Sequence, residues 1–172
     1  MLAVCATAIA SCAPGASPPS DTSVTVSASA TLEPAGGTLT YPAGGGYTAS
    51  FAYGANNAPA GTIANVTAIT NPPASIVPMD PPSGTMLVAY ELTLNQAVTF
   101  TVWNGFISSV TLPQSIQPSG HTFSDYGYDL TLGVASGSDP GTVNGSVVSF
   151  PAGRPPVTLL ANHTYLMVLA MQ

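Results

Sequence analysis

The side chains that could do chemistry are few, and the most closely spaced acids are Asp125 and Asp129, in the segment Phe-Ser-Asp-Tyr-Gly-Tyr-Asp-Leu. Two carboxyl groups can catalyse glycoside hydrolysis when they lie about 5 Å or about 6.5–9.5 Å apart. Residues four apart on a strand share a face but are separated by about 13 Å. The spacing therefore disfavours a glycosidase unless a loop brings the two side chains together.

The candidate bases for a serine hydrolase are His121 and His163. A nucleophilic serine also needs a strained elbow, and the closest segment, residues 133–137, reads Gly-Val-Ala-Ser-Gly and not Gly-x-Ser-x-Gly. No strand-to-helix turn is expected around Ser136. We therefore predict that the chain is not an enzyme, and a small secreted hydrolase is the third of three functional hypotheses.

Metal and cofactor sites have little support. Residues 139–144 place oxygen ligands in one loop but lack the dense acidic pattern of a calcium loop. His163 and Met167 share strand parity and could offer nitrogen and sulfur to copper, yet no cysteine follows Cys12 to complete such a site. Met167 is more simply a core residue, so we predict no metal and no cofactor.

Carbohydrate binding is the stronger alternative, because several aromatic side chains could form one stacking face beside acidic groups that accept sugar hydroxyls. The opposing interpretation is that aromatic residues on strands pack in the core or across strands. The candidate platform consists of Trp103, Phe106, Tyr126, Tyr128, Asp125 and Asp129.

Composition limits the class of protein. The chain has 172 residues, one Lys or Arg against seven Asp or Glu, and a formal net charge of −6. A nucleic-acid groove needs clustered basic side chains, and Arg154 stands alone, so no nucleic-acid partner is expected. The chain also holds 17 Gly and 17 Pro, which excludes a helical bundle. Thr, Ser, Asn and Gly must therefore supply solubility, which suits a protein outside the cytoplasm.

The N-terminal segment carries a localisation signal. Residues 2–10 form an apolar run that is too short to span a bilayer but fits the core of a signal peptide. The following Ile9-Ala-Ser-Cys12 resembles a bacterial lipobox, although no Lys or Arg precedes the run. The resemblance implies a signal peptide over residues 1–11 and lipid attachment at Cys12. An ordinary secretory signal and a buried N-terminal strand are the alternatives.

The rest of the chain predicts one all-β domain over residues 22–172, joined to the lipidated cysteine by a Pro- and Ser-rich tether over residues 12–21. Short runs of β-branched and aromatic residues alternate with Gly, Pro and Asn, and no stretch has a helical period. We expect a single antiparallel, immunoglobulin-like β-sandwich with no substantial helix outside the signal segment. Strands are predicted at residues 23–30, 37–41, 47–53, 62–70, 86–94, 97–103, 106–112, 122–132, 146–150, 157–160 and 164–170.

Local patterns predict specific connections. Asn104-Gly105 predicts a hairpin turn that sets Trp103 opposite Phe106, and Asn144-Gly145 predicts a second. Residues 71–84, with five Pro, are predicted to carry the chain between sheets. The strand at 164–170 is apolar on both parities, so we expect it to be central and covered on both faces.

Two longer segments resemble known families. Residues 159–165, Leu-Leu-Ala-Asn-His-Thr-Tyr, are similar to the corner of fibronectin-type and other immunoglobulin-like domains, in which a Tyr hydroxyl bonds to the preceding loop; Tyr165 takes that position. More broadly, residues 30–172 resemble a group of bacterial secreted and lipoprotein β-sandwich proteins. That resemblance is carried by the segments at 56–62, 141–150 and 160–165, and it implies a fold without implying an activity.

The sequence thus predicts a non-catalytic lipoprotein of the bacterial cell envelope, lipid-anchored or secreted, with a structural or adhesive role. Its expected partners are the membrane, through the anchor, and a polysaccharide or another envelope protein. The alternative is a carbohydrate-binding module that uses exposed aromatic side chains.

Overall fold

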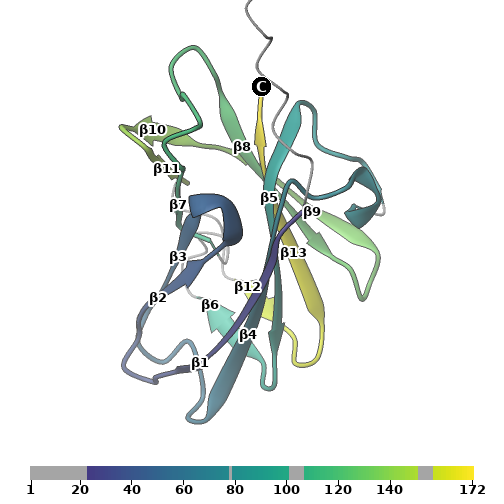
Figure 1. Cartoon of the computed structure of the whole chain (residues 1–172). Helices are drawn as coiled ribbons and strands as arrows, with labels where there is room; N and C mark the ends of the chain where they lie inside the picture. Colours follow the sequence, from purple (N-terminus) through teal and green to yellow (C-terminus); the bar gives the residue numbers. More distant parts are fainter. Residues whose placement is uncertain (1–22, 78, 101–106, 151–156) are drawn as a thin grey trace, which may run out of the picture.

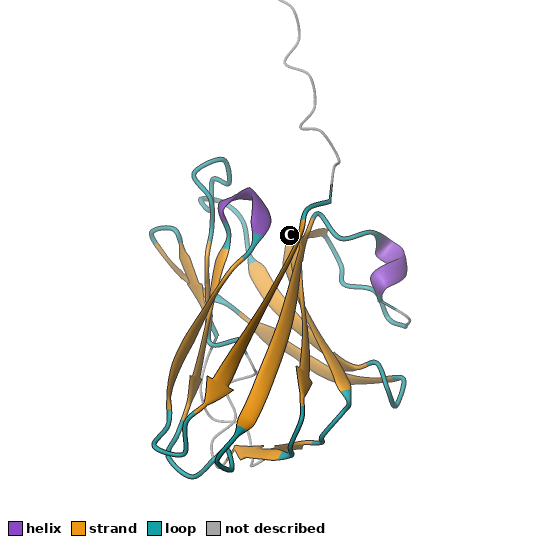
Figure 2. Cartoon of the chain, turned by 60° about the horizontal axis from the view of Figure 1, so that its bottom comes forward, coloured by secondary structure: helices purple, strands orange, loops and turns teal. Residues whose placement is uncertain are grey.

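Antiparallel strands, several of them with alternating buried and exposed residues, make up most of the part of the chain that the computed structural model describes, residues 23–77, 79–100, 107–150 and 157–172. Two sheets pack face to face, and a two-stranded ribbon lies between them at one end (Figure 1). Helix is limited, in these residues, to the short 3-10 turns η1 (Gly44–Gly46) and η2 (Ala74–Ile76), which lie in connections outside the sheets (Figure 2). The expected all-β sandwich is confirmed.

The larger sheet has six strands in the order β1-β4-β5-β13-β8-β9. Their bounds are β1 (Thr25–Leu32), β4 (Thr62–Thr70), β5 (Thr85–Leu94), β13 (Thr164–Met171), β8 (Phe123–Asp129) and β9 (Val134–Pro140). The second sheet has five strands in the order β10-β11-β7-β3-β2. Their bounds are β10 (Thr142–Asn144), β11 (Val147–Ser149), β7 (Ser109–Thr111), β3 (Thr48–Tyr53) and β2 (Gly37–Pro42). The ribbon pairs β12 (Val157–Leu159) with β6 (Val98–Phe100).

One hydrophobic core lies between the two sheets. Alternate residues of β4 and β5 meet alternate residues of β3, and the ribbon adds the side chains of β6. Phe51 stacks on Tyr53 with ring centroids 5.7 Å apart and meets the edge of Phe100 at 5.6 Å. Such pairs contribute beyond the area that they bury. The ribbon therefore closes one end of the core.

β13 lies between β5 and β8 and is buried on both faces, as its apolar sequence predicts. Met167 and Leu169 face the main core. Leu166 and Val168 face the opposite way, into a second cluster that includes Val77 from the connection between β4 and β5. The expectation that residues 71–84 carry the chain between sheets is wrong. They join neighbouring strands of one sheet, and they fold over its outer face because the apolar side chains of β13 need a cover there.

The predicted hairpin around Asn104-Gly105 does not extend into the described residues on either side. Phe100 pairs with Val157, whereas Ser109 pairs with Ser50 and with Ser149. β7 thus lies inside the second sheet, where Val110 is fully buried, and β6 belongs to the ribbon. β7 gains a hydrogen-bonded neighbour on each side, and β6 packs its side chains into the core. An isolated two-stranded hairpin provides neither. The turn itself, with Trp103 and Phe106, lies outside the described residues.

The second predicted hairpin forms, with its turn one residue later than expected. Asn144 pairs with Val147, so that Gly145 and Ser146 make the turn, and Gly145 has φ 59°. Glycine at the first of two turn residues suits the primed turns that join twisted antiparallel strands. β9 was not predicted, because nearly all of its residues are exposed and no alternation marks it.

Shortening a side chain of β13 tests the central position of this strand. Leu169→Ala should lower the free energy of unfolding by about 2–5 kcal/mol, because Leu169 is fully buried and a cavity would remain. Chemical denaturation monitored by fluorescence measures the change. Leu132→Ala is the matched control, since Leu132 is 61% exposed, and it should change stability by less than about 0.5 kcal/mol. Equal effects of the two substitutions would contradict the central placement of β13.

Candidate functional site

The strand β8 divides the sequence-predicted platform between two faces of the sheet. Asp125 and Asp129 are buried on the inner face, in line with Phe123. Tyr126 and Tyr128 alternate with them and belong to the cluster on the outer face. The four side chains therefore do not form one surface, and the aspartates do not face a ligand that would stack on the tyrosines. The other two platform residues are outside the described part of the chain.

A groove lies on the outer face beside the two tyrosines. Its volume is about 370 Å³. One wall comes from the connection that covers β13 and the other from the β8–β9 pair. The lining residues are Asp80, Pro81, Ser83, Tyr126, Gly127, Tyr128, Ala135, Gly137 and Ser138.

Hydrogen bonds join the two walls of this groove. The Tyr128 hydroxyl donates to the carbonyl of Asp80 at 2.9 Å, and the Tyr126 hydroxyl lies 3.3 Å from Ser83 Oγ. Gln172 Nε2 donates to the Tyr126 hydroxyl at 3.2 Å and also bonds Ser83. Burial raises the pKa of Tyr128, and the neighbouring Tyr126 and Asp80 raise it further. Tyr128 is therefore a neutral hydrogen-bonding group at physiological pH, and its buried ring is not a stacking surface.

Two glycines line the groove on the side of the β8–β9 pair. Gly127 lies directly opposite Gly137, and the next pair joins Tyr128 to Ala135, so Ser136 is an extra residue in β9. This bulge sits beside Gly137, whose φ of 113° favours glycine. Gly127 and Gly137 both line the groove, and the half-buried Tyr126 ring is the aromatic face along this side.

Asp125 has a structural partner. Its Oδ1 accepts the backbone N–H of Asp139 at 2.8 Å, across the β8–β9 pair. The carboxylate is buried, so this bond satisfies both a charged oxygen and a strand N–H in the protein interior. Asp125 is thus used to hold the edge strand β9.

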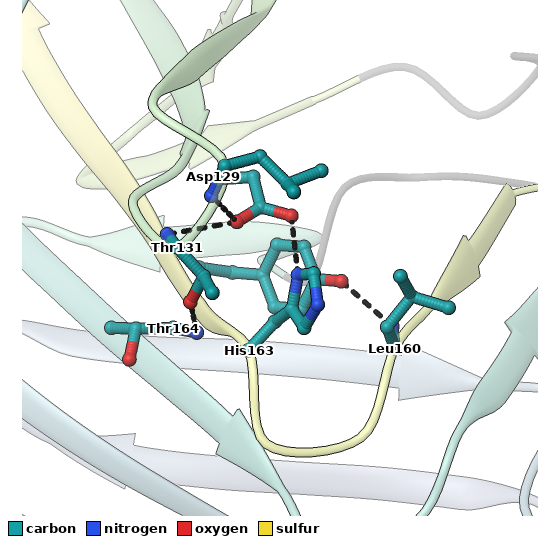
Figure 3. A network of polar contacts seen from close by, with 7 residues as sticks. Asp129, Thr131, Leu160, His163 and Thr164 are labelled. Atoms are coloured by element: carbon teal, nitrogen blue, oxygen red, sulfur yellow. Dashed lines mark hydrogen bonds and ion pairs between the residues drawn. The ribbon is translucent and has the colours of Figure 1, made fainter.

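Asp129 organises the turn between β8 and β9 (Figure 3). Its Oδ1 accepts the N–H groups of Thr131 and Leu132, both at 3.0 Å, and its Oδ2 lies 2.9 Å from His163 Nδ1. An ionised carboxylate only accepts hydrogen bonds, so Nδ1 carries the proton. Burial raises the pKa of Asp129, but the hydrogen bonds from His163, Leu132 and Thr131 and the charge of His163 outweigh it and set the pKa below its usual value.

Tyr165 anchors the loop on the other side of this contact. Its hydroxyl accepts the N–H of Leu160 at 2.7 Å, and its ring stacks on His163 with centroids 6.0 Å apart. The bond from Tyr165 to the preceding loop is the geometry that the corner resemblance implied. Thr164 N–H donates to Thr131 Oγ1 at 2.9 Å, which joins the two loops a second time. We call Asp129, Thr131, Leu160, His163, Thr164 and Tyr165, with the N–H of Leu132, the polar corner.

The polar corner contains a His–Asp pair but not the rest of a catalytic triad. In the described part of the chain, His163 forms no hydrogen bond with a serine, and neither histidine lines the groove. His121 is exposed, and its Nδ1 lies 3.3 Å from the carbonyl of Gln172. The pairing can orient an imidazole, as a base needs, yet its evident role is to join two turns.

Within residues 23–77, 79–100, 107–150 and 157–172, no three His, Cys, Asp or Glu side chains gather closely enough to hold a metal ion. Met167 is buried in the main core, whereas His163 belongs to the polar corner, so the two side chains do not form one site.

Of the helical segments that are described, none is long and apolar enough to cross a membrane. Comparison of the chain with protein-family models, curated proteins and solved structures finds no match.

The lowered pKa of Asp129 gives a pH prediction. A carboxylate whose folded pKa lies below its unfolded value, about 3.9, stabilises the fold fully above that value and loses the effect as the pH falls through the folded pKa. Stability should therefore change little between pH 5 and 8 on account of this group and fall below about pH 4. Urea denaturation of the intact chain and of Asp129→Asn at pH 7 and pH 2.5 measures the change.

The variant should lose less stability on acidification than the intact chain, although it starts from a lower value. Glu33→Gln, which removes an exposed carboxylate, is the control and should keep the acid response of the intact chain. If Asp129→Asn also keeps that response in full, the stabilising role of the ionised Asp129 is contradicted.

Proposed function

We propose that this protein is a non-catalytic module of the bacterial cell envelope, anchored by a lipid on Cys12, with a structural or adhesive role. The observation that carries the proposal is the arrangement of the two ends of the sandwich. β1 begins where Thr25 pairs with Ile69, at the end at which β13 finishes opposite Thr85. A tether that precedes Ser23 therefore holds the domain by this end, and the opposite end points away from the membrane.

Four exposed apolar side chains lie at the end that points away. Leu132 and Leu160 belong to the two loops of the polar corner and are 61% and 45% exposed, and Val134 pairs with Asp129 beside them. Ile63 lies at the same end, where its N–H donates to Asn95. We propose that these side chains form the contact surface of the module, since exposed apolar side chains mark contact sites where they adjoin one another. Because the polar corner fixes both loops, this surface is held rigid without a ligand.

The anchor is tested by Cys12→Ser. The intact chain, expressed in a bacterium that processes lipoproteins, should enter the detergent phase, because the several acyl chains of a lipoprotein hold far more firmly than one. The variant should move to the aqueous phase. Cys5→Ser is the matched control and should partition like the intact chain. Identical partitioning of the intact chain and Cys12→Ser would contradict lipid attachment at Cys12.

Carbohydrate binding is the second candidate, and the groove beside Tyr126 is the observation that favours it. Groups that suit sugar hydroxyls lie on both walls: the carboxylate of the exposed Asp80 and the Ser83 hydroxyl on one, and the Tyr126 hydroxyl on the other. Convergent polar groups beside an aromatic face are typical of such sites.

Binding to cell-wall polysaccharide tests this candidate. If the groove binds sugar, pull-down by insoluble polysaccharide should fall at least about tenfold in Tyr126→Ala, the equivalent of about 1.4 kcal/mol. Tyr126→Phe keeps the ring and loses the hydroxyl bonds, so it separates stacking from hydrogen bonding. Trp103→Ala independently tests one of the two aromatic candidates that lie outside the described residues, the other being Phe106. Retention that none of these substitutions alters, or no retention by the intact chain, would exclude the groove as a saccharide site.

A further inference from the structure

The outer edge of β1 differs from the other edges of the sandwich. β9 is interrupted by the bulge at Ser136 and ends in Pro140, and β2 ends in Pro42. β10 has only three residues. Bulges, prolines and short length are the features that stop edge strands from pairing with other chains. β1 has eight residues in unbroken register with β4 and none of these features.

The free hydrogen-bonding groups of β1 can be assigned from its pairing. Thr70 N–H donates to the carbonyl of Val24, which makes Val24 and Thr70 a hydrogen-bonded pair. Because such pairs alternate along an antiparallel ladder, the N–H and C=O of Ala28 point to β4 and those of Ser27 and Ser29 point outward. Among the described residues, no segment pairs with this outward row.

The sequence of β1 is nearly symmetric about Ala28. Residues 25–31 read Thr-Val-Ser-Ala-Ser-Ala-Thr, which is a palindrome apart from Val26 and Ala30. If two copies of β1 pair antiparallel with a two-fold axis at Ala28, Thr meets Thr, Ser meets Ser and Ala28 meets its own copy. The residues with outward N–H and C=O groups then face each other, and about eight backbone hydrogen bonds form.

The side chains suit this pairing on both faces of the sheet. The exposed face already carries a row of hydroxyl bonds, in which Ser27 Oγ lies 3.0 Å from Thr67 Oγ1 and Ser29 Oγ donates to Asn65 Oδ1 at 2.5 Å. The half-buried Val26, Ala28 and Ala30 form an apolar row on the inner face. A second copy continues both rows.

Charge explains how two copies of an acidic chain can meet here. The net charge is −6, so association of like copies is opposed at most surfaces. β1 and β4 hold no ionisable side chain, so this edge is a neutral part of an acidic molecule.

From these observations we propose that β1 is a self-association site, at which a second copy of this chain adds its own β1 antiparallel and joins the two six-stranded sheets into one. Such a contact is isologous and closes as a dimer. The pairing does not depend on the lipid anchor. Where the anchor is present, antiparallel pairing sends the two N-terminal segments to opposite ends of the joined strands, a geometry that suits copies held on facing surfaces.

Added charge tests the surface. The full chain in neutral detergent should show a concentration-dependent dimer in sedimentation equilibrium. Ser27→Asp combined with Ser29→Asp places acids opposite acids in the proposed register and should weaken the dimer at least about tenfold. Thr38→Asp combined with Thr40→Asp adds the same charge to the exposed positions of β2 and should leave the dimer unchanged.

A charge exchange and a cross-link test the partner and the register. Chains with Ser27→Lys and Ser29→Lys, mixed with the Asp variant, should restore dimers that contain one of each. With Cys5 and Cys12 replaced by Ser, Ala28→Cys should form an intermolecular disulfide, because its Cα would lie about 4.5 Å from its copy. Ala30→Cys, about 13 Å from its copy in this register, should not.

Three results would overturn the proposal. One is a chain that sediments as a monomer from micromolar to millimolar concentration, which would mean that the edge is unused or is covered by other residues of the same chain. Another is a dimer that the Asp variant of β1 leaves unchanged, which would move the contact elsewhere. The third is cross-linking of Ala30→Cys in place of Ala28→Cys, which would reject the two-fold axis at Ala28.

Discussion

Burial of β13 on both faces is the constraint on which the other layers depend. A central strand with apolar side chains on both faces is stabilised by burying them, and this stabilisation is lost on any face that is exposed to water. The second sheet covers the inner face, where Leu169 meets the main core. The connection before β5 covers the outer face with Val77. That connection also forms one wall of the groove, so the candidate binding site is a consequence of how the sheet is covered.

The acidic residues illustrate how a chain with few charges uses them. Asp125 and Asp129 are both buried, and each accepts backbone N–H groups at the edge or the turn of β9. A strand made of small, exposed residues contributes little apolar burial, so hydrogen bonds to charged acceptors hold it in place. Spacing that suggests paired catalytic acids is therefore explained by two separate structural roles. His163 likewise has a structural role, because its hydrogen bond to Asp129 joins the loop before β13 to the turn between β8 and β9.

The two outer strands of the large sheet reach opposite solutions to the problem of an open edge. β9 is bulged, carries Gly137 at a positive φ and ends in Pro140, and Gly137 also lines the groove. β1 is regular, neutral and rich in hydroxyl groups. A protein whose surface contains so few charges relies on backbone geometry to prevent pairing at β9, and at β1 that geometry permits it.

Sequence patterns determined the features that depend on neighbours along the chain. Strand alternation and turn residues gave the all-β class, most strand positions, the central place of the strand at 164–170 and the hairpin after Asn144, because these follow from backbone preferences over a few residues. Successive side chains of a strand point to opposite faces, so the alternation in β8 already places Asp125 and Tyr126 on different faces of the sheet. Strand parity alone was therefore enough to reject a shared platform.

Tertiary structure alone decided which distant segments pair. It separated β6 from β7, placed residues 71–84 over the sheet, and brought His163 to Asp129. It also recruited β9, which has no hydrophobic period to mark it. These outcomes depend on how much apolar surface the whole chain buries when distant segments come together. A pattern of a few neighbouring residues does not contain that information.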